Sequence, residues 1–282
     1  MIVRALHIVL FGLWSLTGST YVLAWGQDGH SIIAEVAQRR LSPKVRDIVD
    51  RLLNHASLAS VASWADDVKF TTHKKTKSWH FVGIPLSRST YDPAKDCADG
   101  CIISALDQLR LQLRCGATEE EKRDALRFIV HLIGDAHQPM HTVEEGGGGN
   151  DFEVRVGFCG LREIGQACQP SEAPVVFHQL WDETLITSAF FDWGGYVDRL
   201  EAGWLKSPAA KAVTQESGTP VDWILQAHAR ARAVWPGSPP TVAIDQKYYT
   251  SALEVIDAEL GSAGIRLARY LDDVHASMSC GN

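Results

Sequence analysis

The chain has 282 residues, of which 45% are hydrophobic and 22% are charged, a composition typical of a globular protein and not of a disordered or collagenous one. Its formal charge is −7, and loss of Arg4 with a cleaved leader would take the charge to −8. This negative net charge argues against a protein that binds a nucleic-acid backbone through a surface of lysine and arginine. It leaves nucleic acid open as a substrate, because bound metal ions add positive charge that a residue count misses.

The first 24 residues have the three-part layout of a secretory signal peptide. Arg4 precedes an apolar run over residues 8–16, and the sequence Val22-Leu23-Ala24 has small residues at the −3 and −1 positions of a cleavage site. The apolar run is shorter than the roughly 20 residues that a membrane-spanning helix needs. We therefore expect a signal peptide over 1–24, a mature domain over 25–282 without a membrane partner, and a secreted or periplasmic location.

Helical periodicity dominates the mature chain and predicts a single, mainly helical (all-α) domain. Glu119-Glu120-Glu121 places carboxylates in a first helical turn, where the helix dipole favours them, and Pro139 ends that helix. Four glycines over 146–149 predict a flexible loop, and the alternating FEVRV at 152–156 predicts a short strand or small β-hairpin. The segments predicted to be helical are, in chain order, 31–41, 42–53, 101–113, 119–136, 176–187, 193–206, 221–234 and 249–274.

Six cysteines in an exported chain favour structural disulfides. Cys97 and Cys101 are close enough in sequence to bridge across a tight turn, and Cys159 and Cys168 bracket a short polar loop. Metal binding by the C-x-x-x-C pair is the alternative, favoured in a reducing compartment. The pairing of the two remaining cysteines, Cys115 and Cys280, stays open.

The strongest chemical signal is the segment HLIGDAHQPMH at residues 131–141. On a helix His131 and Asp135 are one turn apart and project from one face, and the turn at Pro139 can present His141 beside them. Imidazole nitrogen and carboxylate oxygen are ligands that suit zinc. His137 falls on another face, where we expect it to support the ligands or to face solvent. A single His-x-x-x-Asp pair would more often be a helix salt bridge, so the zinc interpretation depends on further ligands.

Further candidate ligands occur on both sides of this segment. His178 and Asp182 repeat the His-x-x-x-Asp spacing, and two such pairs in one exported chain favour a multinuclear metal site. Asp66 in ASWADDVK and His80 in SWHFVGIP are weaker signals. An aspartate at a helix end is usually a cap or a solvated charge, and a lone histidine could be a core residue with its hydrogen bonds satisfied.

The predicted mature terminus offers another candidate. Cleavage after Ala24 would leave a free amine on Trp25, and an α-amino group with a pKa of about 7.7–8.0 can lose its proton to a metal near neutral pH. The amine and carbonyl of Trp25 could then chelate an ion that His30 also binds. Taken alone this is a weak signal, because most mature termini fray.

The joint order of the motifs resembles one enzyme family. W-G-x-x-G-H at the processed terminus, S-W-A-D, W-H-F, H-x-x-G-D-x-H-Q-P-x-H, G-G-N and H-x-x-W-D are similar, in this order, to those of the zinc-dependent single-strand-specific nucleases, a family of fungal nucleases and plant bifunctional nucleases. The resemblance spans the whole mature chain. It implies a monomeric, all-α enzyme of the phospholipase C/nuclease type with three zinc ions in a cleft.

The resemblance also implies which residues hold each ion, and every position that it requires is present here. The first ion would be bound by Asp66, His80, His131 and Asp135. The second would be bound by His141, His178 and Asp182. The third would be bound by the amine and carbonyl of Trp25, by His30 and by a shared Asp135.

The implied reaction is hydrolysis of single-stranded DNA and RNA, and of 3′-nucleotides, to 5′-phosphate products. A water bridging two zinc ions loses its proton near neutral pH and attacks phosphorus in line, while the remaining zinc stabilises the departing 3′-oxygen. No side chain is needed as a general base. We expect Asp66, Asp135 and Lys69 to take part in catalysis, with Lys69 steadying a phosphate; a solvated surface lysine is the alternative for Lys69.

Two further residues align with family positions that contact a nucleobase. Phe81 follows the ligand His80 and would stack against a base, an interaction of about 1–3 kcal/mol that tolerates every base and needs an exposed base face, as single strands offer. A core phenylalanine is the alternative. Asn150 would hydrogen-bond the base edge. Gly83 departs from the fungal pattern, which has a base-contacting aspartate there, and the glycine loop before Asn150 lacks an apolar wall, so we expect weak base preference.

Two rival functions fit parts of the sequence. A zinc-dependent phospholipase C shares the ligand set and the helical fold, but the G-G-N element, Phe81 and the lack of an obvious apolar surface favour a nuclease. A non-catalytic zinc-binding protein is the other rival. Structural zinc sites are usually closed by four protein ligands, whereas the predicted second site has three, which favours catalysis.

Overall fold

The computed structural model describes residues 25–163, 168–170, 174–237, 242–277 and 280, so the predicted signal peptide lies outside the described residues. The described chain is mainly helical, as the periodicity predicts. Its helices and helical turns are α1 (Gly26–Gln38), α2 (Pro43–Leu52), α3 (Leu58–Val61), α4 (Trp64–Val68), η1 (Lys74–His80), α5 (Pro93–Asp96), α6 (Ile102–Cys115), α7 (Glu119–Asp135), η2 (Pro139–Thr142), α8 (Gly146–Gly149), η3 (Leu161–Glu163), α9 (Phe177–Gln179), the π turn η4 (Leu180–Thr184), α10 (Leu185–Thr187), α11 (Trp193–Ala202), η5 (Trp204–Lys206), α12 (Pro208–Gln215), α13 (Pro220–Val234) and α14 (Gln246–Ser277).

Helix boundaries follow capping side chains. Thr118 and Glu121 form a capping box at the start of α7, in which the Thr118 hydroxyl accepts from the Glu121 amide at 3.1 Å. Ser207 caps α12, a helix that the sequence analysis missed although Pro208 follows this cap, as is common in a first helical turn. The predicted helix over 193–206 is interrupted at Gly203, which separates α11 from η5.

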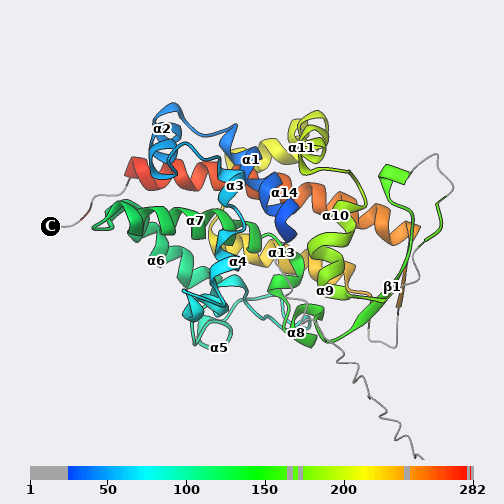
Figure 1. Ribbon diagram of the computed structural model, residues 1–282. Helices are drawn as coiled ribbons and strands as arrows, with labels where there is room; N and C mark the ends of the chain where they lie inside the picture. Colours follow the sequence, from blue (N-terminus) through cyan, green and yellow to red (C-terminus); the bar gives the residue numbers. More distant parts are fainter. Residues whose placement is uncertain (1–24, 164–167, 171–173, 238–241, 278–279, 281–282) are drawn as a thin grey trace, which may run out of the picture.

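The longest helix, α14, organises the core. Figure 1 shows it running across the molecule from the side of the β-sheet towards the C-terminus, and it contacts α1, α7, α10 and α12. Three fully or almost fully buried tryptophans, Trp25, Trp181 and Trp223, are among the largest core side chains. The α1 helix begins at Gly26, before the predicted start at residue 31, so the W-G-x-x-G-H motif forms its first turns and is held against this core.

One small sheet has the strand order β2-β1-β3. The predicted strand is present as β1 (Glu153–Gly157), and it pairs in antiparallel fashion with β2 (Pro174–Val176). A parallel strand, β3 (Val242–Asp245), completes the sheet on the other edge of β1 and was not predicted. The strand β2 leads directly into α9, so the sheet fixes where the helix that carries His178 begins.

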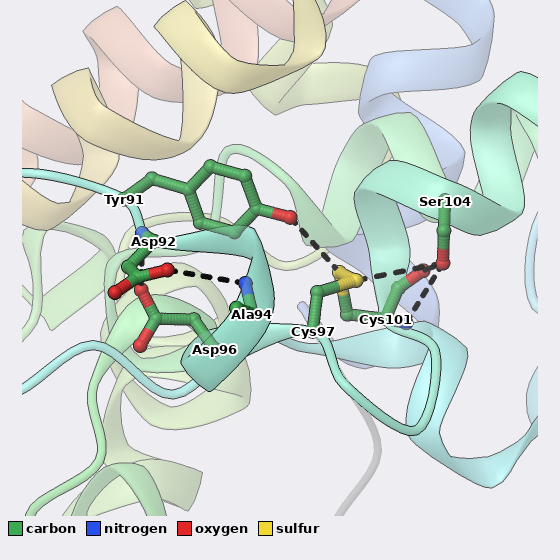
Figure 2. The surroundings of a disulfide bond; sticks show 7 residues. All are labelled: Tyr91, Asp92, Ala94, Asp96, Cys97, Cys101 and Ser104. Atoms are coloured by element: carbon green, nitrogen blue, oxygen red, sulfur yellow. Dashed lines mark hydrogen bonds between the residues drawn. A yellow bond between two sulfur atoms is a disulfide. The ribbon is translucent and has the colours of Figure 1, made fainter.

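Three disulfides cross-link the chain, including both that the sequence favoured, Cys97–Cys101 and Cys159–Cys168. Cys115 and Cys280, whose pairing the sequence left open, also form a disulfide, which joins the end of α6 to a residue near the C-terminus. Figure 2 shows the Cys97–Cys101 bridge beside Ser104, whose hydroxyl accepts from the Cys101 amide at 3.0 Å. This bridge therefore ties the loop after α5 to the first turn of α6.

None of the described helices is long and apolar enough to cross a bilayer.

Candidate metal centre

Two residues of α7 form the centre of the site. His131 and Asp135 are fully buried and one helical turn apart, with His131 Nε2 at 3.2 Å from Asp135 Oδ2. The α7 helix buries its last turns, so both side chains project into the protein and not into solvent. The local spacing read from the sequence is thus realised on one helix face.

Asp66 and His80 approach this pair from other elements. Asp66 lies on α4 and His80 ends η1. The Nδ1 atom of His80 is 3.0 Å from Asp135 Oδ2, 3.1 Å from His131 Nε2 and 3.5 Å from Asp66 Oδ1. The structure therefore brings the four predicted ligands of the first ion together, although Asp66 and His80 were weak signals alone.

A second cluster joins His141, His178 and Asp182. His178 Nε2 is 3.3 Å from Asp182 Oδ2, His141 Nε2 is 3.9 Å from Asp182 Oδ1, and ligand atoms of the three residues lie within 4.8 Å of one another. Asp182 lies on the π turn η4, a type of helical irregularity that is frequent at functional sites.

His30 connects the first helix to the centre. Its Nε2 atom is 3.3 Å from Asp135 Oδ1, the carboxylate oxygen turned away from His80 and His131. Trp25 is buried, its indole donates to the Gly134 carbonyl at 2.9 Å, and its own carbonyl accepts from the Gly29 amide. One oxygen of Asp135 thus faces His30 and the other faces His80 and His131, while ligand atoms of His30 also lie within 4.8 Å of those of Asp66 and His131.

Gly134 makes room for His30. A Cβ at this position would lie 2.7 Å from His30 Nδ1, closer than real Cβ contacts allow. The glycine of the H-x-x-G-D motif therefore has a packing reason that depends on α1, which is far away in the sequence.

Backbone carbonyls fix three imidazoles. The Nδ1 atoms of His131, His141 and His178 face the carbonyls of Ala62, His80 and Gly148 at 2.8, 2.7 and 2.9 Å. Because a carbonyl only accepts, each Nδ1 carries a hydrogen, so each imidazole in its neutral form presents a lone pair on Nε2 to its cluster. None of these three acceptors was predicted from the sequence.

Gln138 was also missed, although it lies inside the quoted motif. It is fully buried, its amide nitrogen donates to Asp182 Oδ1, and its carbonyl accepts from the Met140 amide. Gln138 therefore fixes one Asp182 oxygen and leaves Oδ2 facing His178.

The donor set fits metal ions. Buried polar atoms are normally hydrogen-bonded, yet several here have no partner among the described residues. Imidazole nitrogens and carboxylate oxygens that converge in this way are the ligands that zinc takes. The unpartnered atoms at the two clusters and beside them are His30 Nδ1 and Nε2, His80 Nε2, Asp135 Oδ1, His141 Nε2 and Asp182 Oδ2.

The electrostatics also favour cations. Burial lowers the pKa of His30 to about 4 and that of His178 to about 3, which leaves both imidazoles neutral at physiological pH. Burial opposes protonation of His131 too, but the carboxylates of Asp135 and Asp66 outweigh it and raise its pKa to about 10. The position between these carboxylates thus attracts positive charge.

A cavity of about 480 Å³ opens beside the clusters. Lys69 lies in its wall, 8% exposed, with Nζ 2.5 Å from Asp66 Oδ1, so the alternative of a solvated surface lysine is wrong. Phe81 is 51% exposed, so it is not a core phenylalanine. The lining residues are Lys69, Phe70, Lys77, His80, Phe81, Gly83, Met140, His141, Val143, Glu144, Gly147, Asn150 and His178.

Two expectations near the site change. His137 neither faces solvent nor touches the clusters, because it is fully buried and turned towards α14. Its ring faces the Ile133 carbonyl at 2.7 Å and accepts from Arg266 at 2.9 Å.

The glycine segment is a defined turn, since Gly146 to Gly149 all have positive φ, between 55° and 89°. Asn150, next to it, donates to the Gly147 carbonyl at 2.8 Å and keeps its side-chain oxygen for other donors.

The chain is similar to known nucleases over almost its whole described length. A family profile described as S1/P1 Nuclease matches residues 25–276. Nuclease PA3 of Penicillium sp and Nuclease P1 of Penicillium citrinum are each 30% identical over 274 residues, which cover 90% of this chain and 98% of the relative. Endonuclease 2 of Arabidopsis thaliana is 27% identical over 301 residues, which cover 96% and 98%.

Proposed function

Because the chain belongs to the S1/P1 nuclease family and is a hydrolase of the endonuclease type, we propose that it is an exported, zinc-dependent phosphodiesterase that hydrolyses single-stranded DNA and RNA, and 3′-nucleotides, to 5′-phosphate products. The observation that carries this proposal is the pair of buried His/Asp clusters, one built around Asp135 and the other around Asp182, that borders an open cavity.

Nine residues would hold three zinc ions, as the family resemblance implies. Asp66, His80, His131 and Asp135 would bind one, and His141, His178 and Asp182 a second. Trp25, His30 and the other oxygen of Asp135 would bind the third. The contact of His30 Nε2 with Asp135 Oδ1 supports this last assignment.

Bound zinc supplies Lewis-acid chemistry, since it lowers the pKa of water and offsets negative charge on a phosphoryl group. Other groups of the chain hold the metal ligands in position. The carbonyls of Ala62, His80 and Gly148 hold the imidazoles, and Gln138 holds Asp182. We propose that Lys69, in the cavity wall, binds a phosphate oxygen of the substrate.

The cavity also suits a nucleobase. Four large apolar side chains are well exposed among the described residues, and two of them, Phe70 and Phe81, line this cavity. An exposed ring beside the ligands can stack on any base whose face is accessible. Because a duplex hides its base faces, we propose a preference for single strands.

The first experiment compares substrates. The mature protein is incubated with single-stranded DNA, duplex DNA, RNA and phosphatidylcholine, each with and without EDTA. EDTA-sensitive conversion of the single strands to 5′-mononucleotides, with the lipid intact, is the expected result. Lipid hydrolysis with intact nucleic acid would instead transfer the function to a phospholipase C, and zinc content without any hydrolysis would favour a zinc-binding protein.

The role of Trp25 has its own test. Protein that begins at Trp25 is compared with protein that carries one added glycine before it. Because Trp25 is completely buried, we expect the extended protein to lose the third ion, seen as a drop from three to two zinc ions per chain in elemental analysis. Equal zinc content and equal activity would contradict a metal-binding terminus. Mass spectrometry of the exported protein tests cleavage after Ala24.

A further inference from the structure

A carboxylate in the wall of the cavity has no side-chain partner among the described residues. Glu144 is exposed, lines the cavity, and its side chain makes no hydrogen bond or ion pair with the described part of the chain. Its neighbour Glu145 differs, because both of its oxygens accept from the Leu86 amide, at 2.8 and 3.0 Å. Glu145 therefore fixes the loop, while the Glu144 carboxylate is available to a ligand.

The backbone of Glu144 is well fixed. Its amide donates to the Ile84 carbonyl at 3.2 Å, and its carbonyl accepts from the Gly147 amide at 3.1 Å. The adjacent Val143 pairs with Ile84 in an isolated parallel bridge. The carboxylate is therefore carried by a fixed backbone, so only its side chain has to be ordered on binding.

Phe81, Gly83 and Glu144 form one side of the cavity. Residues 81–84 alternate, with Val82 and Ile84 buried in the core and Phe81 and Gly83 facing the cavity. A Cβ at Gly83 would lie 3.5 to 3.9 Å from Cα, Cβ and Cγ of Glu144. The absence of a side chain at Gly83 thus leaves the stem of Glu144 uncovered on the side that faces Gly83.

The charged group on this side is a hydrogen-bond acceptor, because a carboxylate only accepts. Asn150 donates one amide hydrogen to the Gly147 carbonyl and keeps its oxygen and a second amide hydrogen. Two basic groups also line the cavity, and both have partners, since Lys69 contacts Asp66 and Lys77 lies over the Phe70 ring at 4.8 Å. A base stacked on Phe81 must therefore present N–H donors to Glu144.

Only one common base has two adjacent donors on its Watson–Crick edge. Guanine offers N1–H and the N2 amino group side by side, so both carboxylate oxygens can accept. Adenine and cytosine place an acceptor nitrogen beside their amino group, which would repel the second oxygen. Uracil and thymine have a single N–H between two carbonyls.

We propose that Glu144 makes the cavity selective for guanine, a specificity that rests on the proposed function of the same site. Since Glu144 is exposed, the preference is moderate, about tenfold, at the lower end of what a paired hydrogen bond to a base edge gives.

The test measures binding and is independent of turnover. Isothermal titration of the zinc-loaded mature protein compares 5′-GMP, 5′-IMP and 5′-AMP. Guanine offers the adjacent donors N1–H and N2 amino, hypoxanthine keeps only N1–H because it lacks the N2 amino group, and adenine places the acceptor N1 beside its amino group. We expect 5′-GMP to bind about tenfold more tightly than 5′-AMP, with 5′-IMP between them. Glu144→Gln should bring the three affinities close to equality. Glu254→Gln, an identical change at an exposed residue of α14 outside the cavity, should keep the preference.

The outcomes separate this inference from the proposed function. Equal affinities in the unaltered protein, or a guanine preference that survives Glu144→Gln, would overturn the role of Glu144 even if the protein cuts single strands. A guanine preference that depends on Glu144 in a protein that cuts no nucleic acid would support the base site and refute the nuclease.

Discussion

The two oxygens of the Asp135 carboxylate determine how the imidazole ligands of this site are grouped. Asp135 has one oxygen at 3.3 Å from His30 and the other at 3.0 Å from His80, so one carboxylate serves two sets of imidazoles. Such a residue cannot be replaced by one that offers a single acceptor.

Asp135→Asn retains the shape of the side chain but removes its charge and one acceptor. Loss of residues that merely support a metal ligand costs about 10–100-fold in metal affinity or activity, so we expect a loss of at least about 100-fold in nuclease activity together with reduced zinc content. Elemental analysis and hydrolysis of single-stranded DNA measure both. Asp107→Asn, the same change at an exposed residue of α6, is the control. An active Asp135→Asn protein with full zinc would refute the assignment.

Gln138 acts through another residue. It donates to Asp182 Oδ1, so Gln138→Leu should leave Asp182 free to rotate and should weaken the ion bound by His141, His178 and Asp182 by about 10–100-fold. Titration with a chelator of known affinity would show one of three ions released early. Uniform weakening of all ions would indicate general destabilisation instead, and no change would show that Gln138 has no positioning role.

At the scale of elements, the glycine turn α8 holds the second cluster. Gly148 has φ +69°, its carbonyl accepts from His178, and a Cβ there would lie 2.3 Å from the Met140 carbonyl oxygen. The turn and η2 are thus packed too closely for any side chain at this position.

Gly147 and Gly148 form a matched pair for testing this packing. Both have positive φ, so alanine at either costs about 1–2 kcal/mol, but a Cβ at Gly147 meets only Asn150, at 3.8 Å. We expect Gly148→Ala to be more destabilising than Gly147→Ala by about 1–3 kcal/mol and to lower zinc content. Urea unfolding and elemental analysis measure the difference. Equal effects of the two substitutions would show that backbone strain alone matters.

Contacts within one helix could be predicted from the sequence, whereas contacts between distant elements could not. The His-x-x-x-Asp pairs were predicted because both partners lie on one helix, where spacing alone fixes the face. The acceptors Ala62 and Gly148, the role of Gln138 and the strand β3 were not predicted, because each depends on a contact between distant segments. The buried position of His137 follows likewise from α14, which the local pattern of α7 does not contain.

At the scale of the whole molecule, the disulfides differ greatly in the length of chain they close. Cys115–Cys280 joins residues 165 apart and fastens the C-terminus to the end of α6, whereas Cys97–Cys101 joins residues 4 apart. In the chain-entropy description, a cross-link stabilises the folded state by restricting the unfolded chain, and more so for longer loops.

The two bridges can therefore be compared directly. Cys115→Ser with Cys280→Ser should lower the free energy of unfolding by about 5 kcal/mol, and Cys97→Ser with Cys101→Ser by about 2 kcal/mol, because of this difference in loop length. Urea unfolding at a fixed, saturating zinc concentration provides both values, since bound ligand also stabilises the folded state. Neither bridge contacts the metal ligands, so zinc content should stay the same in both variants. A larger loss from the short bridge would mean that local packing around Ser104, and not loop closure, sets the contribution of these disulfides.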